Sequence, residues 1–168
     1  MKRLYFILVL WIGKFGNVLC KIFHKSGTMI SGKVAVKLQK NFVKYFRNID
    51  YDKVIFITGT NGKSTTTNLV SHTVKMAGKE VATNTEGANM MSGVATTLIK
   101  NSSLFGKFNK EFLILEIDER SLRNIFKVLP AKNLCITNLQ KDQVQRNGDP
   151  DFIYQMFKGA VNKDVTLF

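Results

Sequence analysis

The sequence predicts an α/β protein whose parallel sheet is covered by helices on both faces and preceded by an N-terminal helical segment. Three short apolar runs, at 54–57, 112–115 and 134–137, have the length of buried strands. Segments with helical periodicity separate these runs, and strands that alternate with helices form parallel sheets. The chain has 168 residues, 45% of them hydrophobic, which is enough for one domain with a real core.

The first residues predict an amphipathic helix over about 4–24. Its apolar face would hold Phe15, Val18, Leu19, Ile22 and Phe23, and its polar face Lys14, Asn17, Lys21 and Lys25. The apolar run 4–12 follows a basic start, but it is shorter than the roughly 20 residues of a spanning helix, and no small-residue cleavage site follows it. We therefore expect the helix to dock on the body of the protein or to lie at a membrane interface.

A second helical pattern follows a break at 25–28. Its apolar residues Val34, Leu38 and Phe42 are spaced by four, with lysines around them. The polar stretch 48–52 then has the composition of a linker. These features predict a division into an N-terminal basic helical segment, residues 1–50, and a second unit, residues 51–168.

The net charge of +13 is concentrated in the N-terminal third. Residues 1–50 contain ten Lys or Arg and one acid, Asp50, which gives +9 there and +4 in the remainder. Such a segment suits an anionic membrane surface, nucleic acid or a phosphorylated ligand, and equally a solubilising helix face. Cys20 and Cys135 lie in apolar stretches without metal-ligand spacing, which favours reduced core thiols in a cytosolic chain.

The stretch 54–67 has the strand–loop–helix order of a phosphate-binding loop. The loop reads Thr-Gly-Thr-Asn-Gly-Lys-Ser over 58–64. Gly59 and Gly62 let backbone N–H groups converge on an anion, and the first turn of the following helix adds further donors. Lys63 would supply a charge for the β- and γ-phosphates, and Ser64 a hydroxyl for Mg²⁺.

The loop departs from the strict phosphate-binding pattern at one position, because Ile57 stands where the first glycine is required. An alternative interpretation makes Asn61-Gly62 a hairpin turn. The helical periodicity after the loop disfavours this alternative, because a hairpin needs a second strand there.

Strands and helices continue to alternate after the loop. The helix after the loop should end at Gly78, and its core-facing stripe is Leu69, Val70, Val74 and Ala77. A strand over 80–83 and a loop over 84–89 follow. The next helix has the apolar residues Met91, Val94, Ala95 and Leu98. After the strand 112–115, a helix with Leu122, Ile125, Phe126 and Leu129 ends at Pro130. A helical piece over 152–160 and the beginning of a strand over 162–168 end the chain, which suggests an incomplete domain.

Polar residues follow the predicted strands at ends that should meet at one edge of the sheet. The loop 58–64, Asn84, Glu116 and Asn138 all occupy such ends, where ligands gather in parallel sheets. Glu116 ends an apolar strand like the acid of a Walker-B arrangement, which faces the Mg²⁺ that Ser64 touches. An ordinary surface glutamate is the alternative. Asp118 is expected to cap the following helix rather than to bind metal.

These residues resemble those of the Mur ligase superfamily. The loop 58–66 is similar to the ATP loop of that superfamily, which lacks the usual first glycine, so Ile57 supports the resemblance. Within the superfamily, the chain resembles the family of Mur-ligase-like MurT subunits in four stretches: Ser31–Leu38, Asn84–Asn89, Leu115–Glu119, and Thr137–Leu139 with Lys141–Gln143 and Arg146. Gln143 fits this family, because peptide-adding Mur ligases tend to carry a metal-associated His in this stretch.

The resemblance implies that 51–168 is part of a P-loop central domain of the Mur ligase type. It implies an ATP-dependent carbon–nitrogen ligase that amidates the D-glutamate α-carboxyl of lipid II to D-isoglutamine through an acyl phosphate. A GatD-type glutamine amidotransferase would release the ammonia from glutamine. Such a ligase would be cytoplasmic and could work at the inner face of the plasma membrane, in peripheral contact with anionic lipid. No binding of nucleic acid is expected.

The resemblance also implies the roles of the site residues. ATP would be bound by Gly59, Thr60, Asn61, Gly62, Lys63, Ser64, Thr65 and Asn138, Mg²⁺ by Ser64 and Glu116, and the substrate or nucleotide mouth would be lined by Asn84 and Asn89. Family members are longer, with a four-cysteine zinc ribbon and a C-terminal domain that supplies a catalytic Asp. The zinc ligands and that Asp have no counterpart in this sequence, so we expect an N-terminal fragment that is inactive alone.

Two further functions stay open at this stage. One is another Mur-type amino-acid ligase, acting in peptidoglycan or folylpolyglutamate synthesis. The other is a non-catalytic basic module that docks on anionic membrane or nucleic acid through residues 1–50, as the +9 charge beside an apolar helix face allows.

Overall fold

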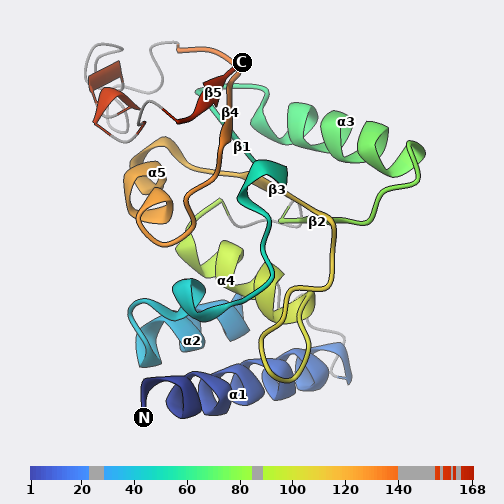
Figure 1. Ribbon diagram of the computed structural model, residues 1–168, viewed down its shortest axis with the longest axis vertical. Helices are drawn as coiled ribbons and strands as arrows, with labels where there is room; N and C mark the ends of the chain where they lie inside the picture. The colour runs from blue at the N-terminus through green and yellow to red at the C-terminus, as the bar shows by residue number, and fades with distance from the viewer. Residues whose placement is uncertain (23–28, 85–88, 140–153, 156, 160, 162–163) are drawn as a thin grey trace.

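The computed structural model describes residues 1–22, 29–84, 89–139, 154–155, 157–159, 161 and 164–168 (Figure 1). Five strands form one sheet in the order β2-β3-β1-β4-β5, and all their pairings are parallel. The strands are β1 (Val54–Thr58), β2 (Val81–Thr83), β3 (Phe112–Glu116), β4 (Asn133–Ile136) and β5 (Thr166–Leu167). The helices are α1 (Lys2–Ile22), α2 (Ile30–Leu38), α3 (Lys63–Met76), α4 (Met91–Lys100) and α5 (Glu119–Phe126), with short 3₁₀ turns η1 (Phe42–Tyr45) and η2 (Tyr51–Lys53). The predicted fold class is confirmed.

The sheet is buried on both faces, as expected of parallel strands. Phe56 of β1 packs edge-on against Phe126 of α5, with ring centroids 5.0 Å apart. Ile57 and Ile114 are fully buried but stand outside the main hydrophobic cluster. Because side chains alternate along a strand, these two isoleucines face the opposite side of the sheet, where α3 lies (Figure 1). Ile57 therefore serves as a core residue of β1.

A helical layer of α1, α2, η1 and α4 lies beside the sheet (Figure 1). Phe6 of α1 is its centre, in ring contact with Phe42, Tyr45 and Phe46. One hydrophobic cluster contains residues of this layer and of the sheet together, from Phe6 to Leu134. The division of the chain near residue 50 stays a prediction. In the part of the chain that the structure describes, no helix is long and apolar enough to cross a membrane.

The apolar face predicted for α1 is not the face that docks on the body. The helix docks on the body, as predicted, but through Phe6, Val9 and Leu10, while Phe15 is 65% exposed. Lys14, a residue of the predicted polar face, donates from Nζ to the carbonyl oxygens of Ile99 at 2.8 Å and Ser102 at 2.6 Å. Helix α1 is apolar on both sides, so its periodicity alone could not identify the buried one.

The apolar spacing of α2 also fails to mark its buried face. Val34 and Leu38 are exposed, whereas the small residues Ser31, Gly32 and Ala35 are buried. A Cβ on Gly32 would lie 1.9 Å from the carbonyl oxygen of Ser92 in α4, so the two helices approach more closely than any larger residue allows. The helix ends at Leu38, before Phe42, which is buried in η1.

The predicted core stripe of α3 is right for Val70 and Val74 and wrong for Leu69 and Ala77. Leu69 is 66% exposed and Ala77 is exposed, whereas Thr67 and Ser71 are buried, with Val70 and Val74 half-buried between them. These four residues at 67, 70, 71 and 74 form one helical face against β1, β2 and β3. The close approach of α3 to the sheet favours small side chains, and this overrides the hydrophobicity of Leu69.

The other predicted elements are confirmed where the structure describes them, except that α5 ends at Phe126 and not at Pro130. Gly78, at φ 76°, follows the end of α3, and Asp118 caps α5 by accepting a hydrogen bond from the backbone N–H of Arg120 at 3.0 Å. The final strand forms as β5 beside β4. The loop 141–148 and much of the helical piece 152–160 lie outside the described residues.

Candidate functional site

The loop 59–62 connects the end of β1 to the first turn of α3. Gly62 caps α3 in the left-handed region, at φ 79° and ψ −2°. The following residues, Lys63, Ser64 and Thr65, form the first turn of the helix, where backbone N–H groups lack carbonyl partners within the helix. The loop therefore has the architecture of an anion site, and a hairpin at Asn61-Gly62 is excluded.

At Gly59 the loop passes close to residues 137–138, which follow β4. Its φ is 127°, which side chains rarely adopt. A Cβ here would lie 2.3 Å from Oγ1 of Thr137 and 2.8 Å from the carbonyl oxygen of Asn138. Both conformation and space thus require glycine at this position.

Asn138 holds the loop through its side chain and its backbone. Its Oδ1 accepts from the N–H of Asn61 and its Nδ2 donates to the carbonyl oxygen of Asn61, both at 3.0 Å. Its own carbonyl oxygen accepts from the N–H of Thr60 at 3.0 Å. Thr137 adds a bond from its hydroxyl to the Asn61 carbonyl, at 2.6 Å. The strand end at 137–138 therefore shapes the loop, while the binding of nucleotide by Asn138 stays a prediction.

Lys63 is folded back over the loop. Its Nζ donates to the carbonyl oxygens of Gly59 and of Thr60, the latter at 3.1 Å. The same Nζ lies 3.1 Å from Oε1 of Glu119, whose side chain is only 3% exposed. A carboxylate this deeply buried is normally paired, and here the pair joins the loop to the start of α5.

Ser64 and Glu116 meet across the mouth of the loop. The Ser64 hydroxyl donates to Oε2 of Glu116 at 2.7 Å, with Ser64 exposed and Glu116 half-buried. A hydroxyl and a carboxylate are hard oxygen ligands of the kind that Mg²⁺ binds, usually together with water and phosphate oxygens. The residues present therefore fit a magnesium ion bound beside a phosphate.

Asn84 acts on the backbone of Glu116. Its Nδ2 donates to the Glu116 carbonyl oxygen and its Oδ1 accepts from the Glu116 N–H, both at 2.8 Å. The side chain, 7% exposed, thus continues the β2–β3 pairing to the strand ends and fixes the position of Glu116. Its place at the ligand mouth stays a prediction, and the structure adds a supporting role behind Glu116.

Two further predicted site residues, Asn89 and Thr65, lie at the start of α5 and on the first turn of α3. Asn89 is half-buried, and its carbonyl oxygen accepts from the N–H of Asp118 at 2.8 Å, next to the cap of α5. Thr65 is exposed on the first turn of α3. The segment 85–88 and the residues 141–143 and 146, which contributed to the sequence resemblance, lie outside the described residues.

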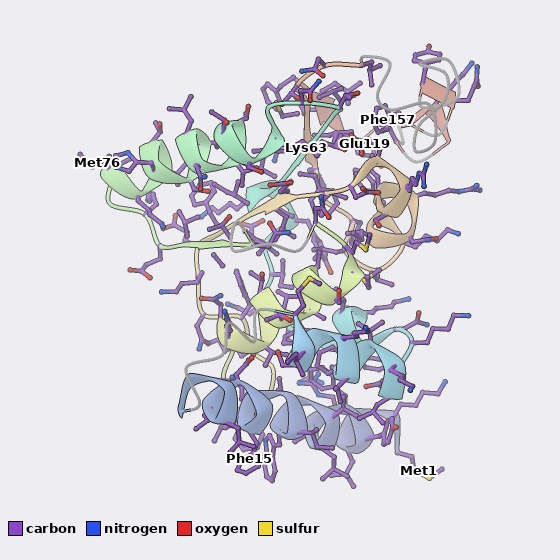
Figure 2. The ribbon with its side chains drawn as sticks, turned by 180° about the vertical axis from the view of Figure 1, so that it is seen from behind. Met1, Phe15, Lys63, Met76, Glu119 and Phe157 are labelled. Atoms are coloured by element: carbon purple, nitrogen blue, oxygen red, sulfur yellow. The ribbon has the colours of Figure 1, made fainter. Side chains whose placement is uncertain are left out.

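Glu119 is the site residue that the sequence did not reveal. It follows Glu116 by three residues in the stretch Leu-Glu-Ile-Asp-Glu, but one residue ends a strand and the other begins a helix. Figure 2 shows Lys63 and Glu119 next to each other, although they are 56 residues apart in the chain. A further glutamate three residues after the strand-end carboxylate was the available signal.

Comparisons with known proteins agree with this geometry. The model of the family described as the Mur ligase middle domain matches residues 57–161. The subunit MurT of lipid II isoglutaminyl synthase (glutamine-hydrolyzing) from Staphylococcus aureus strain COL is 31% identical over 157 residues, which are 93% of this chain and 35% of that protein. Its counterpart from Streptococcus pneumoniae is 36% identical over 140 residues, covering 83% of this chain and 30% of that protein.

A solved structure gives the same fold. The crystal structure of MurF ligase from Thermotoga maritima in complex with ADP superposes with a TM-score of 0.56, at 18% identity, over 81% of this chain and 30% of that one. The chain thus spans about a third of the length of the relatives that it matches. With the family model covering more than half of its residues, the chain belongs to the Mur ligase family.

Proposed function

We propose that the chain is the nucleotide-binding part of an ATP-dependent ligase that amidates the D-glutamate α-carboxyl of lipid II to D-isoglutamine. The observation that carries the ATP site is the Ser64–Glu116 contact at the mouth of the loop, 2.7 Å long, with Lys63 on the same turn. The match to MurT subunits over 93% of the chain supports the amidation. Because the chain spans about a third of those relatives, the complete reaction would need residues beyond this segment.

Each residue of the loop has a distinct part in this proposal. The N–H groups of the first turn of α3 bind the phosphates, and Gly59 lets the backbone pass close enough to 137–138 to present them. Lys63 neutralises phosphate charge. Ser64 and Glu116 hold Mg²⁺, which would neutralise the charge that develops during phosphoryl transfer. Asn138 and Asn84 keep the loop and Glu116 in place.

The proposed partners follow from the MurT match. A GatD-type glutamine amidotransferase would supply ammonia, and lipid II would be the acceptor, in the cytoplasm where ATP is available. Zinc has no part in the proposed role of this segment. The alternative within the family is a ligase that adds an amino acid instead of ammonia.

The ATP site is tested by the binding of a fluorescent ATP analogue to the purified chain in the presence and absence of Mg²⁺. Wild-type chain should bind, and Lys63→Ala should lose at least about tenfold in affinity, because a charge-assisted contact to phosphate is removed. Lys75→Ala, at the other end of α3, is the matched control and should bind like wild type. Equal affinities of wild type and Lys63→Ala would contradict the proposal.

The reaction is tested with lipid II, glutamine, ATP and a glutamine amidotransferase, added to the chain and, where the reading frame continues, to its longer product. Conversion of the stem-peptide glutamate to its amide supports the proposal. Addition of an amino acid instead would favour the alternative ligase. The product's mass distinguishes the two outcomes directly.

A further inference from the structure

The outer side of α1 is an exposed apolar surface. It consists of eight exposed residues of the helix, Leu4, Tyr5, Leu8, Trp11, Ile12, Phe15, Val18 and Leu19, and two residues of the loop after α4, Leu104 and Phe105. We call these ten residues the apolar outer face. Figure 2 shows Phe15 pointing away from the body of the protein. Phe15 is 65% exposed and Phe105 is 64% exposed, so the surface contains large side chains that nothing in the described chain covers.

The two segments of this face are held together by hydrogen bonds. Nε1 of Trp11 donates to the carbonyl oxygen of Leu104 at 2.9 Å, and Nη2 of Arg3 donates to that of Phe105 at 2.7 Å. Figure 1 shows the loop after α4 reaching down to α1. The apolar outer face is therefore one continuous surface built from segments about a hundred residues apart.

The opposite side of α1 is already occupied. Phe6, Val9 and Leu10 are buried against the helical layer, and the Lys14 ammonium points inward to the carbonyl oxygens at the end of α4. The lysine in the middle of the helix is thereby removed from the outer side. Between Leu4 and Leu19 the outward stripe carries no charge.

The net positive charge of the protein is concentrated in the part of the chain that contains this face. In the sequence, residues 1–49 and 87–110, which include α1, α2, η1, α4 and the loop after α4, contain 13 of the 25 Lys and Arg and none of the 12 Asp and Glu. The rest of the chain has twelve of each and is neutral. Lys2 and Lys107, at the border of the apolar outer face, are both exposed. An uncharged apolar stripe thus lies in a part of the chain whose own charged residues are all cations.

We propose that the apolar outer face is a docking surface for a lipid bilayer that contains anionic lipids. The helix would lie in the interface, with its exposed apolar side chains among the acyl chains and the surrounding cations near the headgroups. Such a bilayer offers both an apolar phase for the exposed side chains and anionic headgroups for the cations. Nucleic acid offers charge but no apolar phase for eight helical side chains. A second copy of the chain would bring another purely cationic layer against the first.

This proposal does not rest on the ligase function. Figure 2 shows Phe15 and Lys63 at opposite ends of the molecule, so a membrane contact at α1 leaves the phosphate loop free. A failure of membrane binding is therefore distinguishable from a failure of ATP binding, because the two are measured at different sites.

The test uses Trp11, which is the only tryptophan in the sequence and lies on the proposed face. The purified chain is mixed with vesicles of phosphatidylcholine alone or with added phosphatidylglycerol. With the anionic vesicles, the emission of Trp11 should shift to shorter wavelength and the chain should sediment with the lipid. High salt should weaken the binding, because it screens the cations. Equal binding to the two kinds of vesicle, or none to either, would overturn the proposal.

Two pairs of substitutions separate the apolar and the charged contributions. Leu8→Ser with Phe15→Ser should weaken binding by at least about tenfold, because two large apolar side chains no longer enter the bilayer. Lys2→Glu with Lys107→Glu should also weaken binding to anionic vesicles by at least about tenfold. The matched control is Leu69→Ser with Met76→Ser, which alters two still more exposed apolar residues of α3 and should bind like wild type.

Circular dichroism of each variant shows that the fold is kept, since all substituted residues are exposed. Unchanged binding by Leu8→Ser with Phe15→Ser would overturn the proposal. Sedimentation equilibrium gives a second test. A wild-type dimer that Leu8→Ser with Phe15→Ser converts to monomers would also overturn the proposal, because the face would then be an interface between copies of the chain.

Discussion

The ammonium of Lys63 lies 3.1 Å from the carboxylate of Glu119, which is buried at the start of α5. The loop lysine is therefore neutralised by a residue of the protein itself when no phosphate is present. Replacing Glu119 by Gln leaves the lysine with two carbonyl acceptors and no counter-charge.

We predict that Glu119→Gln lowers the free energy of unfolding by about 3 kcal/mol, since one member of a buried ion pair is lost. ATP with Mg²⁺ should restore part of this loss, because phosphate oxygens can replace the missing carboxylate. Thermal unfolding with and without Mg-ATP measures both effects, and the nucleotide-induced rise in Tm should be larger in the variant than in wild type. Glu80→Gln, which removes the exposed pair with Lys110, is the control. A smaller rise in the variant would contradict this role of Glu119.

Gly59 and Gly62 should respond differently to alanine, although both have positive φ. A Cβ at Gly59 overlaps Thr137 and Asn138, whereas a Cβ at Gly62 meets nothing within 4 Å. Gly62→Ala should cost about 1 kcal/mol from its left-handed conformation alone. Gly59→Ala should cost clearly more and should weaken nucleotide binding, because the loop must move away from the end of β4. Chemical denaturation compares the two, and equal costs would show that the close approach is unimportant.

Lys14 should stabilise the docking of α1 on α4. Its Nζ satisfies the carbonyl oxygens of Ile99 and Ser102 near the end of α4, and burial lowers its pKa from the ordinary value of 10.5. Lys14→Ala removes a charged donor from these carbonyls, so it should lower the free energy of unfolding by about 1.5–3 kcal/mol. Lys33→Ala, an exposed lysine of α2, should change it by less than about 0.5 kcal/mol. Denaturant titration of the two variants against wild type provides the measurement.

Glu111 connects the starts of three strands. Hydrogen bonds from Lys53, which precedes β1, and then from Lys79, which precedes β2, hold the pKa of Glu111 below its ordinary value of 4.5. Because the folded-state pKa is lowered, the stabilisation is present above about pH 4.5 and disappears as the pH falls through the lowered value. Glu111→Gln should therefore reduce Tm slightly at pH 7 and by less at an acidic pH below 4.5. A Tm difference that is the same at both pH values would refute this linkage.

The sequence was sufficient for the features that depend on neighbouring residues. Apolar runs of strand length, the glycines of the loop, the cap at Asp118 and the stop at Gly78 act within a few residues of themselves, and each is found where its pattern predicts. The alternation of these elements leads to a parallel sheet, and the ends of parallel strands meet at one edge. The convergence of the loop, Asn84, Glu116 and Asn138 followed from this topology.

The tertiary structure was needed wherever a residue's role depends on which neighbour packs against it. Helix α1 is apolar on both sides, α2 is buried through Gly32 and Ala35, and α3 through Thr67 and Ser71, so hydrophobicity could not choose their buried faces. The pairing of Lys63 with Glu119, across 56 residues, is likewise invisible in a linear pattern. Local sequence patterns specify which helices and strands form. Close packing between these elements then selects the buried side chains by their size. Contacts between residues distant in the sequence exist only once the elements are packed together.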